Sequence, residues 1–344
     1  MYSFYGLGTQ WCVAISLEIT MKKTILALAT SAVLSPAYAY EIINNDTAYL
    51  DVYGEVKARA FFYDNESNDY TFGESKIGVD ARYSVTDTTS VLSLVEAEIN
   101  FDAEEDKDED DLYLSKYYAG AQHEVLGTLT FGKHATTSDD LNGVDYSEAF
   151  GGLANLNAVS QHDLGLKYKF ETEVFALSVN YGPEAGDLDR EIMEAYGQYF
   201  LADLTLTAGV GSSSTNVTQN SKDELYSMLS GELNMGDYKL GATYYNTDIE
   251  DRSNSQLDVK KNAFAIAGQI EIIEKLFGYT GYEFISQDSN TRTLDGEINN
   301  FYLGSRYEII EWASVYAEVN LVDDGTKVVD EQATNYALGA TVSW

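Results

Sequence analysis

Apolar and polar residues alternate with a period of two along most of this chain. The pattern is clear between Leu50 and Phe62, between Ala313 and Leu321, and from Asn335 to the terminal Trp344. A β-strand sends successive side chains to opposite faces, so each such segment has one apolar and one polar face. The pattern predicts an all-β chain of about sixteen strands.

Two architectures use this alternation, a soluble sandwich with its apolar faces inward and a membrane barrel with its apolar faces outward. The segments run for about 9–12 residues, which is enough to cross a bilayer when the strands are tilted. The polar faces are rich in charge and glycine, a composition that suits a water-filled lumen better than a dry core. We therefore expect a transmembrane antiparallel β-barrel.

The predicted connections alternate in length, as short periplasmic turns and longer outer loops do in such barrels. Pro183, the only proline after Pro36, is expected in one of the longer loops because proline cannot donate to a strand ladder. The short connections are predicted near 86–89, 125–127, 171–173, 201–203, 235–237 and 309–311. The longer ones are predicted near 64–70, 102–111, 183–190, 212–222, 248–258, 287–297 and 323–331.

Composition excludes several classes of function. The formal net charge of −35 argues against nucleic-acid binding, which needs a basic surface. Disorder does not explain the acidity, because 13% of the 344 residues are aromatic, with 27 tyrosines. Beyond the first 40 positions no apolar run reaches the length of about 18 residues that a transmembrane helix needs.

The first 39 residues have the pattern of an export signal. A basic start at Met21 leads into a short apolar stretch, and Ala37-Tyr38-Ala39 is a small-residue cleavage site. We expect residues 1–20 to be an upstream extension, 21–39 a signal peptide, and 40–344 a single barrel domain that begins at Tyr40. A membrane anchor is the weaker alternative, because the apolar stretch is short. Cleavage would remove Cys12, the only cysteine, so no disulfide framework is expected.

One segment departs from the pattern of strands and turns. A strand near 128–133 leads into a long stretch rich in Gly, Asp and Asn, at about 134–162. Loops of this length inside a compact domain are uncommon and usually functional. We interpret it as a loop that narrows the hole inside the barrel.

Four motifs in order resemble the trimeric general diffusion porins of Gram-negative outer membranes. They are the opening strand 52–58, the strand 129–133, the acidic stretch 145–152 that ends in Phe-Gly-Gly, and a final strand that ends in an aromatic residue. The resemblance implies a sixteen-stranded homotrimeric barrel in the cell outer membrane, with a constriction loop folded inward against basic residues of the wall. The chain departs from the family in ending with Trp344 where Phe is usual, in Glu55 where a base is common, and in Gln161 or His162 where a base is expected.

Alternation and the resemblance together give the candidate pore residues. Opposed acidic and basic groups across a narrow gap would set a transverse field and tune ion selectivity. The alternative is that these charges only solvate a wide polar lumen. On the loop, the acidic candidates are Asp139, Asp140, Asp145 and Glu148. On the wall, the candidates are Glu55, Lys57, Arg59, Lys76, Arg82, Lys167 and Lys169.

An acidic run at 102–111 resembles in position the family's second loop, which latches over the neighbouring subunit. Glu104 and Glu105 are latch candidates, and Lys133, whose parity places it on the outer face, could receive a carboxylate from the next subunit. The alternative is a solvated acidic loop, bridged by divalent cations to lipopolysaccharide. The run lacks the glycine and spacing of an EF-hand, so no metal site or cofactor is expected. Trp344 is the expected signal for the barrel assembly machinery.

No enzyme is expected, because His123, His134 and His162 are scattered and form no hydrolase or zinc motif. The sequence favours a passive, water-filled and cation-selective channel for small hydrophilic solutes and ions. One alternative is a substrate-specific channel of the sugar type, with a ladder of inward aromatics for which Tyr53, Phe61 and Tyr63 are only a hint. A barrel hydrolase or adhesin is the weaker alternative.

Overall fold

The computed structural model describes residues 40–64, 67–99, 112–157, 159–185, 190–217, 220–254, 257–291, 295–326 and 329–344. Within these ranges the chain forms one short helix, α2 (Thr137–Asp140), and a single antiparallel sheet. The first half of the sheet contains β1 (Tyr40–Asn44), β2 (Ala48–Phe62), β3 (Asp69–Thr71), β4 (Ser75–Thr86), β5 (Thr89–Ile99), β6 (Leu112–His123), β7 (Gly127–Ala135), β8 (Gln161–Glu171) and β9 (Phe175–Ala185). The second half contains β10 (Arg190–Leu201), β11 (Leu204–Val217), β12 (Asn220–Asn234), β13 (Tyr238–Asp251), β14 (Val259–Ile273), β15 (Leu276–Ser289), β16 (Gly296–Ile310), β17 (Ala313–Thr326) and β18 (Val329–Ser343).

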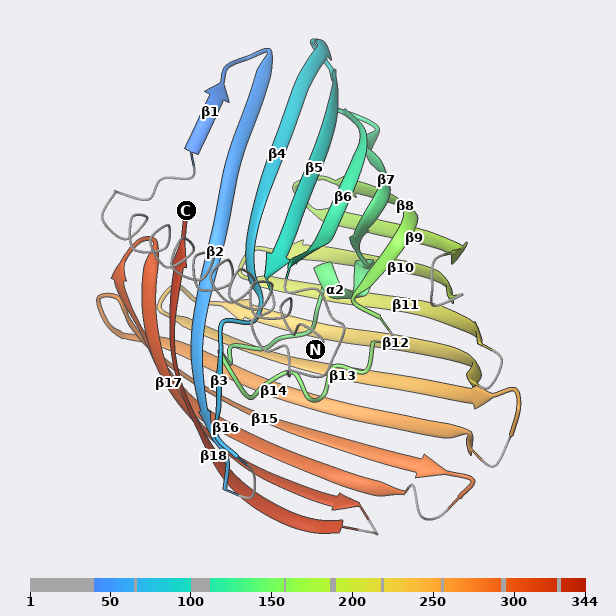
Figure 1. Ribbon diagram of the computed structural model, residues 1–344, viewed down its shortest axis with the longest axis vertical. Coiled ribbons are helices and arrows are strands. Elements are labelled where there is room, and N and C mark those ends of the chain that lie inside the picture. The colour runs from blue at the N-terminus through green and yellow to red at the C-terminus, as the bar shows by residue number, and fades with distance from the viewer. Residues whose placement is uncertain are drawn as a thin grey trace, which may run out of the picture.

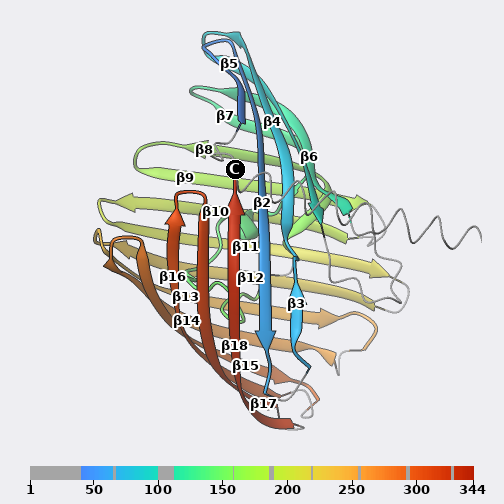
Figure 2. The ribbon, with the colours of Figure 1, turned by 60° about the vertical axis from the view of Figure 1, so that its left-hand side comes forward.

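The sheet closes on itself to form a barrel. Each strand from β4 to β18 pairs antiparallel with its sequence neighbour, and β18 pairs with β2, from Tyr336↔Phe62 to Ser343↔Glu55 (Figures 1 and 2). The short β1 is the other arm of a hairpin with β2, and β3 pairs with β2 in line with β4. The closed ring therefore has sixteen strands, as predicted, and leaves no open edge.

The apolar face of the barrel is its outer face. Large apolar side chains from all sides of the ring are exposed, while the inward positions carry polar and charged groups that are buried against one another. This inside-out arrangement is the one that lipid requires, and it excludes the sandwich alternative. The exposed set includes Ile77, Val79, Val91, Leu129, Phe131, Leu166, Leu206, Val210, Leu229, Leu240, Phe264, Ile266, Leu303, Leu321 and Leu338. None of the helices in the described ranges is both long and apolar enough to span a membrane.

Two expectations about the connections are wrong. Several stretches predicted as long loops continue the ladder: β11 and β12 pair as far as Val217↔Asn220, within the predicted loop 212–222. Paired strands satisfy their own backbone groups, so a strand can extend even where neither face is apolar. Pro183 lies within β9 rather than in a loop. It is tolerated there because the register with β10 shifts between Arg190 and Ile192, and because the pairing of β9 with β8 ends at Tyr181.

Candidate functional site

The candidate site is built on the segment 136–160, which connects β7 to β8 and runs inside the barrel. Its two ends are closed against each other: Thr136 N donates to Ser160 O at 2.8 Å, and Thr136 Oγ1 donates to Val159 O at 2.8 Å. Thr136 also caps α2, because its Oγ1 accepts from Asp139 N. The segment therefore leaves the wall through a narrow neck and runs inside the barrel (Figure 1). Its polar contacts reach the inward faces of β9, β10, β13 and β15–β17. We call it the lumen loop.

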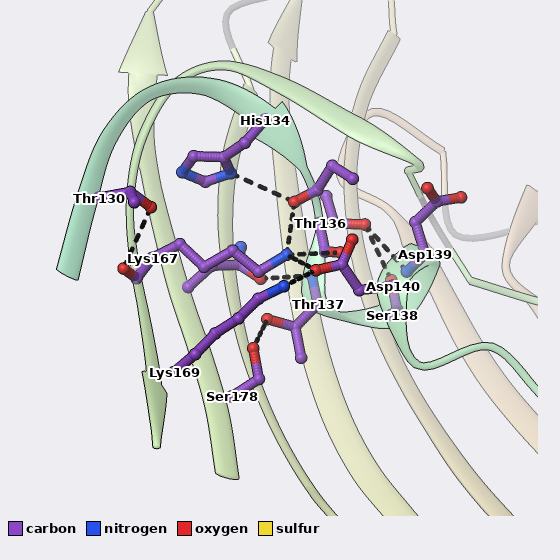
Figure 3. A network of polar contacts seen from close by, with 12 residues as sticks. Thr130, His134, Thr136, Thr137, Ser138, Asp139, Asp140, Lys167, Lys169 and Ser178 are labelled. Carbon is purple, nitrogen blue, oxygen red and sulfur yellow. Dashed lines mark hydrogen bonds and ion pairs between the residues drawn. The ribbon is translucent and has the colours of Figure 1, made fainter. Parts of the chain in front are cut away.

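Lys167 of β8 secures the neck. Its buried ammonium donates to Ala135 O at 2.8 Å, to Thr136 O at 3.1 Å and to Asp140 Oδ2 at 2.6 Å, and Lys169 pairs with the same oxygen (Figure 3). Burial alone would raise the pKa of Asp140, but these two lysines outweigh it and hold the pKa below its usual value. The structure thus joins three of the expected pore residues into one network, in which their charges compensate locally instead of facing each other across a gap.

A buried glutamate anchors the start of the lumen loop. Glu194 of β10 is 1% exposed and accepts from Thr137 N at 2.7 Å, from Ser138 N at 3.1 Å and from Ser138 Oγ at 2.5 Å. Tyr226 OH donates to the same carboxylate at 2.5 Å. Because Tyr226 lies flat against Gly211, where an added Cβ would be 2.4 Å from the ring, the tyrosine also fixes the position of this anchor.

A second glutamate holds the middle of the lumen loop. Glu283 of β15 is 3% exposed and accepts from three consecutive backbone N–H groups: Gly152 at 2.9 Å, Leu153 at 3.3 Å and Ala154 at 3.1 Å. Asn300 Nδ2 donates to it at 2.8 Å and also to Phe150 O at 2.7 Å. Hydrogen bonds to an ionised acceptor are stronger than neutral ones, so this contact fixes the backbone firmly.

A third glutamate, Glu318 of β17, holds the acidic stretch. It accepts from Ser147 Oγ at 2.6 Å and from the N–H groups of Glu148 and Phe150, each at 2.9 Å. Tyr279 OH donates to it at 2.9 Å. Three inward carboxylates of the wall therefore receive the loop backbone, and their signal in the sequence was only an acidic residue at an inward-facing position.

The predicted loop acids Asp145 and Glu148 lie in this stretch, and each has a partner on β16. Tyr302 OH donates to Asp145 Oδ1 at 2.8 Å, and Arg306 Nη1 pairs with Glu148 Oε1 at 2.8 Å. Arg306 was not among the residues expected from the sequence. It reduces the net charge that Glu148 presents to the lumen.

Asp139 is another exposed acid of the lumen loop. Its side chain is exposed and points away from the lysines that hold Asp140 (Figure 3). The walls around it replace part of its bulk hydration, which raises its pKa, and the adjacent Asp140 raises it further, while the positive charge of Lys116 on β6 acts in the opposite direction.

Apolar contacts also hold the lumen loop against the barrel wall. Ala154 and Leu156 pack against the inward alanines Ala263 and Ala265 of β14, small residues that leave room for the loop. Phe150 stands edge-on to Phe61 of β2, with ring centroids 5.8 Å apart. The loop thus packs on β14 and also reaches β2 at Phe61.

The wall of β2, β4 and β6, which we call the opposite wall, carries most of the predicted basic residues, and the structure shows acids beside them. Lys57 lies 3.4 Å from Glu55 and 3.3 Å from Glu74, and Arg59 lies 2.9 Å from Glu74. Lys76 is 3.8 Å from Glu55. Glu74 is a residue that reasoning from the sequence missed. Further along this wall Arg82 is exposed and interacts electrostatically with Asp80, and Lys116 pairs with Glu96 at 3.0 Å.

Three other groups of predicted residues are placed as follows. Lys133 lies opposite Tyr117, whose ring is exposed on the outer face, and it pairs with Asp163 of the same chain at 3.2 Å. Glu104 and Glu105 lie outside the described residues, as do the predicted extension and signal peptide. Trp344 continues the pairing of β18 with β2 through two backbone hydrogen bonds to Gly54, and its ring covers that glycine.

The histidines occupy structural positions. His123 Nδ1 accepts from Val125 N at 3.0 Å in a turn. His134 and His162 are buried opposite each other on β7 and β8, at the two ends of the lumen loop. Among the described residues, no group of three or more His, Cys, Asp or Glu side chains is arranged to hold a metal ion.

Comparison with known proteins agrees with this geometry. The model of the Gram-negative porin family matches residues 24–341. The major outer membrane protein of Pasteurella multocida strain Pm70 is 24% identical over 286 residues, which cover 74% of this chain and 80% of that protein. The outer membrane porin PhoE of Escherichia coli K12 is 26% identical over 228 residues, which cover 62% of this chain and 64% of that protein.

Solved structures show the same barrel. The in-vitro folded outer membrane protein OmpT of Vibrio cholerae is 28% identical, covers 89% of this chain and all of its own, and superposes with a TM-score of 0.78. An anion-selective porin from Comamonas acidovorans, at 14% identity and a TM-score of 0.71, shares the fold. With the family model matched along nearly the whole chain and a closed sixteen-stranded barrel around an inward loop, the chain belongs to the Gram-negative porins and resides in the outer membrane.

Proposed function

We propose that the chain forms a passive, water-filled and cation-selective channel for small hydrophilic solutes and ions, and that it is not an enzyme. The observation that carries the proposal is the lumen loop, which is fixed to one side of the barrel by Glu194, Glu283 and Glu318. A fixed loop narrows the lumen without plugging it, because the side chains of the opposite wall stay partly exposed to water.

The sign of the selectivity follows from how the charges are compensated. Lys57 and Arg59 on the wall have acidic partners within 3.4 Å. Glu283 and Glu318 are instead held by N–H and O–H dipoles, and no base lies within ion-pair distance of either among the described residues. Dipoles carry no net charge, so the surface around the constriction stays negative and concentrates cations.

The fold alone does not set this sign. The structure described as an anion-selective porin has the same fold at 14% identity, so the sign must come from the particular side chains of each chain. In this chain the exposed carboxylate of Asp139 and the paired bases of the wall favour cations.

The sugar-specific alternative is weakened by the positions of the inward aromatics. Phe61 is 9% exposed and packs between Tyr63 and Phe150, and Tyr53 OH is bonded to Glu96 at 2.9 Å. Rings engaged in this way leave little free face on which a sugar could stack. We therefore retain general diffusion.

We further propose a homotrimer, because the solved relatives include OmpT of Vibrio cholerae in a trimer form. The latch through Glu104 and Glu105, contacts with lipopolysaccharide, and recognition of Trp344 by the barrel assembly machinery belong to the same proposal. Lys133 can serve the latch only by exchanging its partner Asp163. Export through a signal peptide at 21–39, with a mature chain from Tyr40, is tested by N-terminal sequencing of the purified outer-membrane protein.

The reversal potential in a planar bilayer under a KCl gradient tests the channel and its selectivity together. We expect discrete conductance steps and a reversal potential displaced toward that of potassium. Asp139→Lys should move it toward chloride, whereas Glu297→Gln, which alters an exposed carboxylate of β16, should not. A silent bilayer would refute the channel, and a reversal potential on the chloride side would refute the selectivity.

A further inference from the structure

The wall opposite the lumen loop contains a bulge at the junction of β3 and β4. Glu55 pairs with Lys76 and Arg59 with Thr71, so the chain between Thr71 and Lys76 has one residue more than its partner strand. Glu74 in this bulge has φ +62°, a left-handed conformation that is uncommon for any residue other than glycine. Such a conformation persists only where its surroundings impose it.

Hydrogen bonds within the barrel wall hold Glu74 in this left-handed conformation. Ser75 is 1% exposed; its Oγ donates to Phe72 O at 2.7 Å and accepts from Lys57 N at 3.1 Å. Gly73 N donates to Thr71 Oγ1 at 2.7 Å. The bulge is therefore a fixed part of the wall.

The bulge places the carboxylate of Glu74 within ion-pair distance of two bases. Lys57 and Arg59 lie 3.3 and 2.9 Å from it, and Arg59 Nη2 also donates to Gly73 O at 3.1 Å. The side chain of Glu74 is 59% exposed, whereas those of Lys57 and Arg59 are 30% and 14% exposed. An ion in the lumen therefore meets the acid before it meets the bases.

We infer that Glu74 is a selectivity-determining residue of the channel: it neutralises the basic strip of Lys57, Arg59 and Lys76 and keeps the wall open to cations. This inference rests on the proposed function and deepens it. Without Glu74, Glu55 would be the only acid within 4.0 Å of these three bases among the described residues, and the strip would attract anions.

The size of the effect follows from Coulomb's law. One unit charge at about 6 Å in water changes the local concentration of a monovalent ion about threefold. Removing a negative charge lowers the local cation concentration and raises the local anion concentration. The ratio of cation to anion permeability should therefore fall by about threefold to tenfold. High salt should suppress the change, because the Debye length falls to about 3 Å at 1 M.

The test compares Glu74→Gln with wild type in planar bilayers under a KCl gradient at low salt. Glu311→Gln is the matched control, because Glu311 is an exposed carboxylate in the turn between β16 and β17. We expect only the Glu74 variant to shift its reversal potential toward chloride, and Lys57→Gln to shift it toward potassium. A potassium-selective wild type with an unchanged Glu74→Gln would overturn the inference and leave the proposed function standing. An anion-selective or silent wild type would instead refute the proposed function itself.

A second variant separates the effect of the lost carboxylate from an effect of misfolding. Glu74→Gly removes the carboxylate but accepts the left-handed backbone more readily than any other residue, so it should insert and conduct at least as well as the glutamine variant. Retention of wild-type selectivity in Glu74→Gly would equally overturn the inference.

Discussion

Replacing Glu283 by glutamine should loosen the lumen loop and widen the channel without opening the barrel. The carboxylate accepts from the backbone of Gly152, Leu153 and Ala154 and from the amide of Asn300. Glutamine has nearly the same shape, but it keeps only one acceptor oxygen and places an NH₂ group where the other oxygen was. The loop would therefore lose one of its two acceptor oxygens while the packing around it stays the same.

The expected magnitude follows from the bonds lost. The oxygen Oε2 accepts from Leu153 N at 3.3 Å and from Asn300 Nδ2 at 2.8 Å, and both donors would then face an NH₂ group. A hydrogen bond to a charged acceptor contributes about 1.5–3 kcal/mol, so about 3–6 kcal/mol of local anchoring is lost. With a factor of ten for each 1.4 kcal/mol, detachment of the loop near these residues becomes about 10² to 10⁴ times more frequent.

Single-channel recording at symmetric salt measures this change. We expect larger current noise and a higher mean conductance in Glu283→Gln, together with faster entry of larger sugars into proteoliposomes. The shift in gel mobility between boiled and unboiled samples should stay as in wild type, because the ladders of β15 with β14 and β16 are untouched. Glu297→Gln on the neighbouring strand is the control for a lost carboxylate.

The reasoning is wrong if Glu283→Gln conducts with wild-type noise and sugar limit while it is correctly inserted. That result would mean that the bonds which Glu283 Oε2 receives from Leu153 N and Asn300 Nδ2 contribute nothing to the bore.

Three further predictions concern pH and stability. Because the pKa of Asp139 lies above the usual value, cation selectivity should fall as the pH is lowered from 7 toward 4, and Asp139→Asn should remove part of this dependence in reversal-potential titrations. Lys167→Met should destabilise the neck of the loop by about 3–5 kcal/mol, because its buried ammonium holds two carbonyls and a carboxylate, and thermal unfolding in detergent should shift downward. Gly211→Ala should lower the free energy of unfolding by about 1–3 kcal/mol, since its Cβ would be 2.4 Å from the ring of Tyr226. Gly231→Ala, whose Cβ would be 3.4 Å from Leu206 Cδ2, should be nearly neutral.

The barrel was predictable because alternation is a local signal. Each apolar position on the outer face recurs every second residue, so strands and their orientation could be read without knowing their partners. The ends of the strands could not be read in this way. The stretch 212–216 is polar on both faces, yet it stays paired with β12. The turn at Glu274 and Lys275 was missed as well, because it interrupts apolar strands without a glycine or proline, and Lys275 adopts φ +68°.

The site was only partly predictable, because its contacts are distant in the sequence. The acidic loop and the inward bases could be located from composition and parity. The bond from Gly152 to Glu283, however, spans 131 residues, and it depends on which strand faces the loop across the lumen. Asp140 does meet two of the expected wall bases, Lys167 and Lys169, but it meets them at the neck of the loop.

The lumen loop is attached through its backbone, and this separates two properties of the channel. Wall side chains such as Glu283 accept from the loop's N–H groups, so the position of the loop, and with it the bore, depends on the wall. The exposed carboxylates of Asp139 and Glu74 take little part in that attachment, so they can set the field in the lumen without moving the loop. Variants of the first kind should change which solutes fit, and variants of the second kind should change which ions pass. The division would be contradicted if a glutamate that accepts from the loop backbone, such as Glu283, altered only the sign of selectivity. It would also be contradicted if an exposed acid such as Asp139 or Glu74 altered only the size limit.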